Sequence, residues 1–340
     1  MKPKIADALN FYSTLSPTKI VNAFQLISSY YFSRLINKPI HWGKLAAIAF
    51  EPTTSCNLRC PQCPSGIRSF TRPTGNLDQT LFYQTIDEIK SHLMYLTFYF
   101  QGEPYLNPKF LEMVAYANQK NIYTSTSTNA HYLDQANAKA TVESGLNRII
   151  ISIDGTAQDT FQKYRVGGKL DKVIEGTKNL IEWKKKLKSS TPHILFQFIV
   201  MKHNEHQIEE IKSLAKTIGV DELQLKTAQI YDYEHGSDLL PTNEKYSRYH
   251  KSHNSNYEIN NQLLNHCWKM WHSCVITWDG SVVPCCFDKD ASNSLGQLSH
   301  EKLSSIWKNK LYQNFRTRIS KSRKEIEICK NCSEGTKIFQ

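Results

Sequence analysis

The stretch CNLRCPQC places Cys56, Cys60 and Cys63 in a C-x3-C-x2-C pattern early in a 340-residue chain. Three thiolates can hold three corners of a 4Fe-4S cluster and leave the fourth iron open to a small molecule. Structural zinc bound with a histidine is the alternative, because a CxxC step suits either metal. The spacing favours the cluster, and the missing fourth ligand is then the functional feature.

Six further cysteines lie near the C-terminus, at Cys267, Cys274, Cys285, Cys286, Cys329 and Cys332. The segment VITWDGSVVPC among them is typical of a β-hairpin with Asp279 and Gly280 at the turn. Nine unevenly grouped cysteines without a secretory signal do not resemble a disulfide framework. They indicate metal-bound thiolates in a reducing cytoplasm.

The formal net charge of +11 suits nucleic acid, a membrane surface or an anionic substrate. The lysines are scattered, and the dense basic runs at 184–188 and 321–324 are predicted to be solvated helical faces. No zinc-finger, helix-turn-helix or RNA-binding signature accompanies them, so we do not expect nucleic-acid binding.

Short apolar segments alternate with longer amphipathic ones over most of the chain. Strands are predicted at 45–52, 95–100, 122–127, 148–154, 193–200 and 222–226, and helices at 79–90, 108–119, 134–144, 171–186 and 205–218. Strands separated by helices pair in parallel, as an open sheet or an incomplete barrel. Ligands of such folds gather at the C-terminal ends of the strands.

Polar motifs fall at those strand ends. The cysteine triplet follows the first strand, and the next three strands end at GEP, at an asparagine and at SIDG. The residues concerned are Gly102, Glu103, Pro104, Asn129, Ser152 and Asp154.

A helix is predicted over residues 16–37, with Ser16 as its N-cap. Its apolar face consists of Ile20, Phe24, Ile27, Tyr31 and Leu35. Too many polar residues interrupt the segment for a membrane span. We expect the helix to pack against the main domain, and peripheral contact with a membrane surface is the alternative.

The triplet and the strand-end motifs together resemble the radical S-adenosylmethionine (SAM) enzymes. The resemblance implies a partial (β/α)6 barrel of the α/β class whose 4Fe-4S cluster holds SAM. It also implies cleavage of SAM to a 5'-deoxyadenosyl radical, which takes a hydrogen atom from the substrate. A cytoplasmic electron donor such as a flavodoxin or ferredoxin would supply the electron.

The resemblance also assigns roles to individual residues. Gly102, Glu103 and Pro104 match a GGEP loop that holds the methionine amino group, with Gln101 in place of the first glycine. Ser152 and Asp154 correspond to residues that reach the ribose and methionine groups, and Asn129 to the polar residue that ends the third strand. Arg165 matches an arginine that pairs with the methionine carboxylate. The simpler alternatives are a helix cap for Glu103 and a surface charge for Arg165.

The C-terminal cysteines resemble the SPASM or twitch extension of such enzymes. The resemblance implies a second 4Fe-4S cluster on Cys267, Cys285, Cys329 and Cys332, and zinc is the alternative. Cys274 and Cys286 are predicted to be buried structural thiols, although Cys286 competes with Cys285 as a ligand. A following helical segment, 295–316, should direct Leu303, Ile306 and Trp307 inward.

The chain is therefore predicted to contain an N-terminal helical segment (1–44), the barrel (45–230), a linker (231–262) and a small auxiliary domain with a hairpin and a helix (263–340). General-base candidates in the linker are Asp232, Glu234, His235 and Asp238. The expected reaction is oxidation or rearrangement of a small sugar, cyclitol or lipid-linked substrate. The alternatives are radical modification of a peptide or protein and a non-catalytic metal-cluster scaffold.

Overall fold

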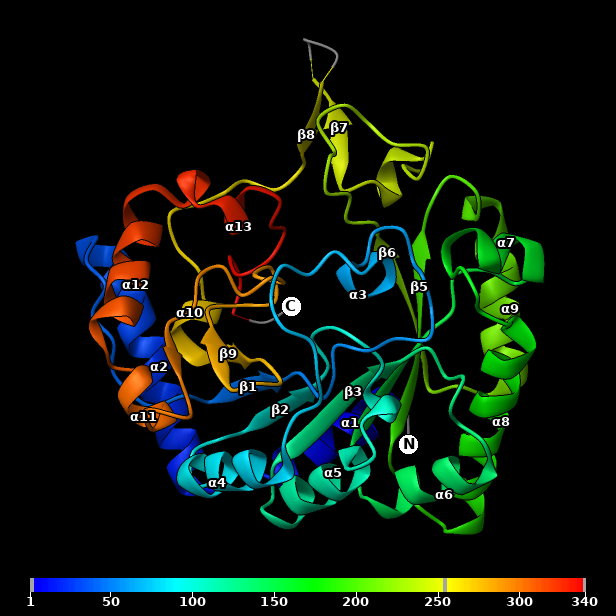
Figure 1. Cartoon of the computed structure of the whole chain (residues 1–340), viewed down its shortest axis with the longest axis horizontal. Helices are drawn as coiled ribbons and strands as arrows, with labels where there is room; N and C mark the ends of the chain where they lie inside the picture. Colours follow the sequence, from blue (N-terminus) through cyan, green and yellow to red (C-terminus); the bar gives the residue numbers. More distant parts are fainter. Residues whose placement is uncertain (1–2, 253–255, 339–340) are drawn as a thin grey trace.

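A computed structural model describes residues 3–252 and 256–338 of the chain (Figure 1). Nine strands form one sheet in the order β11-β10-β9-β1-β2-β3-β4-β5-β6, and β7 and β8 form a separate antiparallel pair. The strands are β1 Ala47–Phe50, β2 Tyr95–Phe98, β3 Tyr123–Thr128, β4 Arg148–Ser152, β5 His193–Val200, β6 Glu222–Thr227, β7 Tyr249–Lys251, β8 Tyr257–Ile259, β9 Ser273–Ile276, β10 Ser281–Val283 and β11 Gly296–Gln297.

Helices cover the outside of the curved sheet (Figure 1). The α-helices are α1 Pro3–Ser13, α2 Pro17–Ile36, α3 Pro64–Ile67, α4 Gln79–Ile89, α5 Phe110–Gln119, α6 Gln135–Glu143, α7 Gln158–Tyr164, α8 Leu170–Lys186, α9 Ile208–Ile218, α10 Lys269–His272, α11 Leu303–Ile306, α12 Lys310–Ser322 and α13 Glu327–Lys330. Short 3-10 helices are η1 Pro104–Leu106, η2 Glu205–Gln207, η3 Glu244–Tyr246 and η4 Arg323–Glu325.

The six predicted strands β1 to β6 are all present and pair in parallel. Side-chain caps fix the starts of several helices between them. The carboxylate of Asp78 accepts the Leu81 N–H at 2.9 Å, and that of Asp134 accepts the Asn137 N–H at 2.8 Å. The predicted α/β class and the parallel barrel-like sheet are confirmed.

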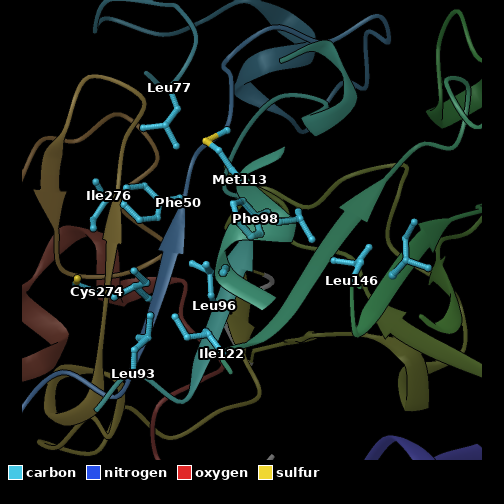
Figure 2. Close-up of a cluster of buried hydrophobic side chains, with 14 of the residues drawn as sticks. Phe50, Leu77, Leu93, Leu96, Phe98, Met113, Ile122, Leu146, Cys274 and Ile276 are labelled. Carbon is cyan, nitrogen blue, oxygen red and sulfur yellow. The ribbon is translucent and has the colours of Figure 1, made fainter. Parts of the chain in front are cut away.

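The C-terminal hairpin extends this sheet. Strand β9 pairs in parallel with β1 and antiparallel with β10, with Gly280 at φ +84° in the turn as predicted. In Figure 2, Ile276 and Cys274 of β9 lie beside Phe50 of β1 in one continuous core. The C-terminal region therefore shares the hydrophobic core of the barrel.

The segment predicted to be helical over 295–316 contains two helices, α11 and α12. Leu303, Ile306 and Trp307 are buried, as predicted. Asn309 interrupts the helix and caps α12 by accepting the Tyr312 N–H at 2.9 Å.

The N-terminal helices differ from the sequence-based expectation. Helix α2 has the predicted Ser16 cap and packs against the main domain as expected, but of its predicted apolar face only Ile27 contacts the core. Ile20, Phe24, Tyr31 and Leu35 are exposed, whereas Leu26 and Tyr30 are buried. Helix α1, which the pattern did not predict, covers the start of β3 and β4. Its buried Asp7 pairs there with Arg148 and the Tyr123 hydroxyl.

Candidate active site

The cysteine triplet follows β1 in a loop at the C-terminal edge of the sheet. The Leu58 N–H donates to Cys56 Sγ at 3.4 Å, and Arg165 Nη1 lies 3.8 Å from Cys60 Sγ. Burial raises the pKa of the Cys56 thiol to about 12 and also raises that of Cys60. A bound metal overcomes this cost because coordination deprotonates thiols. The three thiols lie close enough to act electrostatically on one another, and N–H groups donate to two of them, so the loop fits the predicted 4Fe-4S cluster.

Two glycines allow this loop to pack closely against its neighbours. A Cβ at Gly66 would lie 2.6 Å from the backbone of Cys60. Gly102, at φ +74°, would place a Cβ 2.2 Å from the Thr53 carbonyl oxygen. The next N–H, of Glu103, donates to the Ser55 carbonyl at 2.8 Å. The GEP loop after β2 is thus held against the chain that leads into Cys56, as the strand-end argument requires.

The Glu103 carboxylate points into the protein. It accepts the Thr128 hydroxyl at 2.7 Å, the Asn129 N–H at 2.8 Å and the Tyr105 N–H at 3.4 Å. Burial raises the pKa of Glu103 to about 7, although these hydrogen bonds act in the opposite direction. Glu103 therefore caps η1, as the simpler alternative held, and also joins the ends of β2 and β3.

Arg165 and Asp154, predicted separately, form one buried ion pair. Arg165 Nε donates to Asp154 Oδ2 at 2.6 Å. The other carboxylate oxygen of Asp154 accepts the Ile199 N–H at 2.7 Å, and Asn204 Nδ2 donates to the Asp154 carbonyl. Arg165 is therefore not a free surface charge, because it links the end of β4 to the thiol of Cys60.

The structure brings together the residues assigned to SAM binding. Asn129 Nδ2 donates to Asn57 Oδ1 at 2.8 Å within the cysteine loop and lies 3.9 Å from Cys56 Sγ. Gln101, which replaces a glycine, lies 3.9 Å from Cys63 Sγ through its side-chain oxygen. Ser152, at the end of β4, is 8% exposed. Their roles toward SAM remain predictions.

The general-base candidates lie on the surface of the linker. Asp232, Glu234, His235 and Asp238 all have exposed side chains. His235 Nδ1 pairs with Asp232 Oδ1 at 2.8 Å on the surface, where both side chains are more than three-quarters exposed. The segment begins at the cysteine loop, where the Tyr231 N–H donates to Gln62 Oε1 at 3.1 Å, and the assignment of a base to it stays a prediction.

Three of the four predicted auxiliary ligands, Cys267, Cys329 and Cys332, lie around a buried arginine, Arg323. Arg323 Nη2 donates to Cys332 Sγ at 3.2 Å, and the charge of Arg323 acts on Cys329. A Cβ at Gly335 would lie 2.5 Å from Cys267 Sγ. Arg323 belongs to a basic run predicted to be solvated, yet it is fully buried. Its side chain supplies positive charge for a thiolate-bound cluster, so this donor set also fits.

Within the described ranges, no three His, Cys, Asp or Glu side chains are spaced to hold a single metal ion. A 4Fe-4S cluster distributes its thiolates over four irons, so its ligands do not converge on one point.

The two remaining cysteines differ from each other. Cys274 is 2% exposed in the core, as predicted (Figure 2). Cys286 is only partly buried, with its Sγ 3.6 Å from the Lys269 ammonium nitrogen. It therefore does not have the apolar surroundings that we predicted. Besides Cys286, the charges of Cys267 and Cys332 act on Cys285, so Cys285 stays the predicted ligand.

A cavity of about 350 Å³ lies between β1, β2 and the C-terminal region. Cys285, Cys286, Lys269, Glu334 and Tyr99 are among its lining residues. Lys269 and Glu334 form an ion pair across it. The volume suits a small molecule.

Three further cations outside the cavity lining act electrostatically on residues of that lining. Burial raises the pKa of Glu334, while the charges of Lys269, Lys226 and Arg248 lower it, and the net shift is downward. Burial lowers the pKa of Lys289, while Cys63 and Cys286 act in the opposite direction. Lys289 is thus close enough to interact electrostatically with cysteines of both groups.

Arg72 fixes the segment that carries Lys289. Its guanidinium forms a two-pronged ion pair with the buried Glu51, and its Nε donates to the Lys289 carbonyl at 3.1 Å. Sequence reasoning missed Lys226, Arg248 and Lys289 because no short motif links them.

Two family models match the chain. The radical SAM superfamily model matches residues 50–217, and the SPASM iron-sulfur cluster-binding domain matches residues 267–333. The first range contains Cys56, Cys60 and Cys63, and the second contains all four predicted auxiliary ligands. The second match identifies the C-terminal region with iron-sulfur binding rather than zinc.

Similar proteins agree with these matches. The chain is 27% identical over 301 residues to a tungsten-containing aldehyde ferredoxin oxidoreductase cofactor-modifying protein of Pyrococcus furiosus, which covers 78% of this chain and 82% of the relative. Among solved structures, BtrN in complex with AdoMet and 2-DOIA has a TM-score of 0.52 and 16% identity, covering 87% of this chain and 95% of BtrN. Streptococcus suis SuiB bound to precursor peptide SuiA has a TM-score of 0.63 and 13% identity, covering 90% and 74%. These two structures are similar in fold.

The cysteine loop, the strand-end residues and the second cysteine set thus occur in the order and in the fold that the two family models describe. The chain belongs to the radical SAM superfamily and is an enzyme of that superfamily with a C-terminal SPASM iron-sulfur domain.

Proposed function

We propose that this enzyme oxidises or rearranges a small substrate that carries an anionic group, held in the cavity beside Cys285 and Cys286. When bound, the triplet cluster and SAM supply the 5'-deoxyadenosyl radical, and the second cluster supplies a site that accepts or donates an electron. The observation that carries the proposal is the charge around the cavity. Lys269 lines the cavity beside Glu334, and the charges of Lys226, Arg248 and Lys289 act on residues of its lining.

The cations differ in whether their charged groups already have partners within the protein. Lys269 is already paired with Glu334. Arg248 donates from Nε to Thr227 at 3.5 Å, but its Nη1 is buried without a hydrogen-bond partner among the residues the structure describes. A buried donor without a partner is costly, and an anionic substrate oxygen would satisfy it. We assign Arg248 and Lys289 to the anionic group.

We place the substrate between Lys289 and Tyr99. Lys289 is within charge range of Cys63 on the SAM side and rests its ammonium 4.8 Å from the Tyr231 ring. Tyr99 lines the cavity on the auxiliary side. A substrate bound between them would be within reach of both cysteine groups. Hydrogen abstraction followed by electron removal requires this position.

Two of the similar proteins support a small substrate. The Pyrococcus relative is described as modifying a cofactor, and BtrN was solved with 2-DOIA. SuiB was solved with a precursor peptide, so peptide modification remains the alternative. We further propose an acidic flavodoxin or ferredoxin as electron donor, because the net charge of +11 favours an acidic partner.

The test is fractionation of small-molecule extracts by anion exchange, with substrate-dependent formation of 5'-deoxyadenosine as the readout. We expect the stimulating activity to be retained on the column. The variants Arg248→Met and Lys289→Met should each lower kcat/KM for that fraction by about tenfold to a hundredfold, because each removes a charge-assisted contact.

Substrate-free cleavage of SAM is the internal control and should stay within about twofold of wild type in both variants. The matched control is Lys245→Met, an exposed lysine of η3 close in sequence to Arg248. Stimulation only by peptides, or unchanged kcat/KM in both cavity variants, would contradict the anionic small substrate.

A further inference from the structure

Exposed apolar side chains occur from the first turn of α2 to its last, with Gln25 exposed among them. Phe24 is 71% exposed and Leu35 is 79% exposed. The other exposed apolar side chains of the helix are Ile20, Val21, Tyr31, Phe32 and Ile36, and those of α1 are Ile5, Leu9 and Tyr12. Because these positions of α2 recur at helical spacing, they form one continuous strip, which we call the α2 strip. Exposed strips of this kind usually mark an interaction surface.

The orientation of α2 is fixed by polar residues on its inner face. The Lys19 ammonium donates to the carbonyls of Asn121 and Thr14 at 2.5 and 2.9 Å. The Asn22 side chain bonds both the carbonyl and the N–H of Lys44. Rotating the helix to bury the strip would break these bonds and leave a buried ammonium group unpaired. The exposure of the α2 strip is therefore built into the fold.

The charge of the N-terminal segment indicates what kind of partner binds the α2 strip. Residues 1–44 contain six lysines and arginines and a single acid, Asp7. Asp7 is buried and paired with Arg148. Arg34 and Lys38, at the C-terminal end of α2, are exposed. Two copies of so basic a face would repel one another, whereas an anionic surface would attract it.

A cavity of about 370 Å³ opens at the same end of the helix, between α2 and α12, which run side by side in Figure 1. Arg34, Lys38, Arg316 and Trp271 line it. Arg316 is 2% exposed, and its Nη2 lacks a hydrogen-bond partner within the described residues, as does the buried Trp271 Nε1. Buried donors beside exposed cations suit a phosphate group.

Aromatic residues complete the pattern. The rings of Phe32 and Trp42 stack at 5.6 Å, and Trp42 is 44% exposed. Tryptophan and tyrosine are favoured at the boundary between lipid and water. In the part of the chain that the structure describes, no helix is sufficiently long and apolar to cross a bilayer.

We propose that the α2 strip docks on the surface of a bilayer that contains anionic phospholipids, with a headgroup phosphate in the cavity at Arg34, Lys38 and Arg316. The helix lies in the interface plane, its apolar side chains among the upper acyl chains. This inference is independent of the proposed substrate.

The test is co-sedimentation of the full-length protein with phosphatidylglycerol-rich vesicles and with phosphatidylcholine vesicles. Wild type should pellet with the former, and salt should weaken the binding because its electrostatic part is screened. Phe24→Asp/Leu35→Asp should reduce partitioning by about tenfold or more, and Arg34→Glu/Lys38→Glu should remove the preference for anionic lipid. Leu187→Asp, at an exposed apolar position after α8, is the matched control and should bind as wild type does.

Circular dichroism and thermal melting of each variant establish that it folds. Failure of wild type to pellet with anionic vesicles, or equal binding by the Phe24→Asp/Leu35→Asp variant, would overturn the proposal. Sedimentation equilibrium tests for a second copy of the chain. A wild-type dimer that the Phe24→Asp/Leu35→Asp variant converts to monomer would also overturn it. Inorganic phosphate that competes with vesicles only in wild type would support the headgroup cavity.

Discussion

The two cysteine groups of this enzyme are built for different tasks. The first has three thiols in a loop that faces polar strand ends, including Asn129 and Ser152. The second has four thiols, three of which, Cys267, Cys329 and Cys332, lie around the buried Arg323. A set of three leaves one iron open to a ligand, whereas a set of four closes the coordination shell. The reactivity of each cluster therefore depends on whether one of its irons lacks a protein ligand.

The largest expected effect comes from breaking the open group. Cys60→Ala removes a ligand whose sulfur lies beside Arg165, and SAM cleavage should fall by about a thousandfold or more because the reactive cluster is lost. The measurement is 5'-deoxyadenosine after anaerobic reconstitution and chemical reduction. Persistence of cleavage at the wild-type rate would refute the assignment of the triplet.

Removing a ligand of the four-cysteine group should affect SAM cleavage and product formation differently. Cys329→Ala should leave substrate-free SAM cleavage within about twofold of wild type while product formation falls by about a hundredfold. The reason is that the auxiliary cluster serves the substrate and not SAM. Chromatography of 5'-deoxyadenosine and product in the same reaction measures both. Equal loss of both would mean that Cys329 is needed for the fold of the barrel.

The Glu103 carboxylate predicts a pH dependence of stability in the protein without clusters. Its folded pKa of about 7 exceeds the usual value, so the folded state retains a proton that the unfolded state loses. Stability should therefore fall as pH rises from about 4.5 to 7, by about 3 kcal/mol from this group at most. Glu103→Gln should remove that part of the slope in urea unfolding at several pH values. The same pH dependence of stability in wild type and in Glu103→Gln would contradict a raised pKa of the Glu103 carboxyl.

The smallest effect separates a structural cysteine from a ligand. Cys274→Ala should lower the free energy of unfolding by about 1 kcal/mol and leave the iron content unchanged. Cys285→Ala should instead remove the auxiliary iron, and Cys286→Ala should not. Iron assay and thermal melting of the three variants make the comparison. Loss of iron in Cys286→Ala alone would exchange the roles of the two adjacent cysteines.

The sequence was sufficient for the barrel strands and the strand-end residues. Spacing along the chain gives the cysteine motif, and parallel pairing brings strand ends to one edge, so Glu103, Asn129 and Asp154 could be placed without coordinates. The pairing of Asp154 with Arg165 could not be predicted from the sequence, because each residue had been assigned a separate role toward SAM.

Contacts between distant segments account for what the sequence did not predict. The face of α2 is decided by Lys19 bonding to Asn121, about a hundred positions away in the chain, and not by its own apolar spacing. From the sequence, Arg323 is predicted to be solvated because it lies in a basic run. In the structure its side chain instead donates to Cys332. The cations round the cavity come from separate elements, so no local pattern reports their meeting.

The central claim is that one chain holds an open and a closed iron-sulfur site. Iron and sulfide content after anaerobic reconstitution tests it most directly, on wild type and on the Cys56→Ala/Cys60→Ala/Cys63→Ala variant. The account predicts about eight irons in wild type and about four in the variant, because each site holds one 4Fe-4S cluster. Equal iron in the two proteins would contradict it.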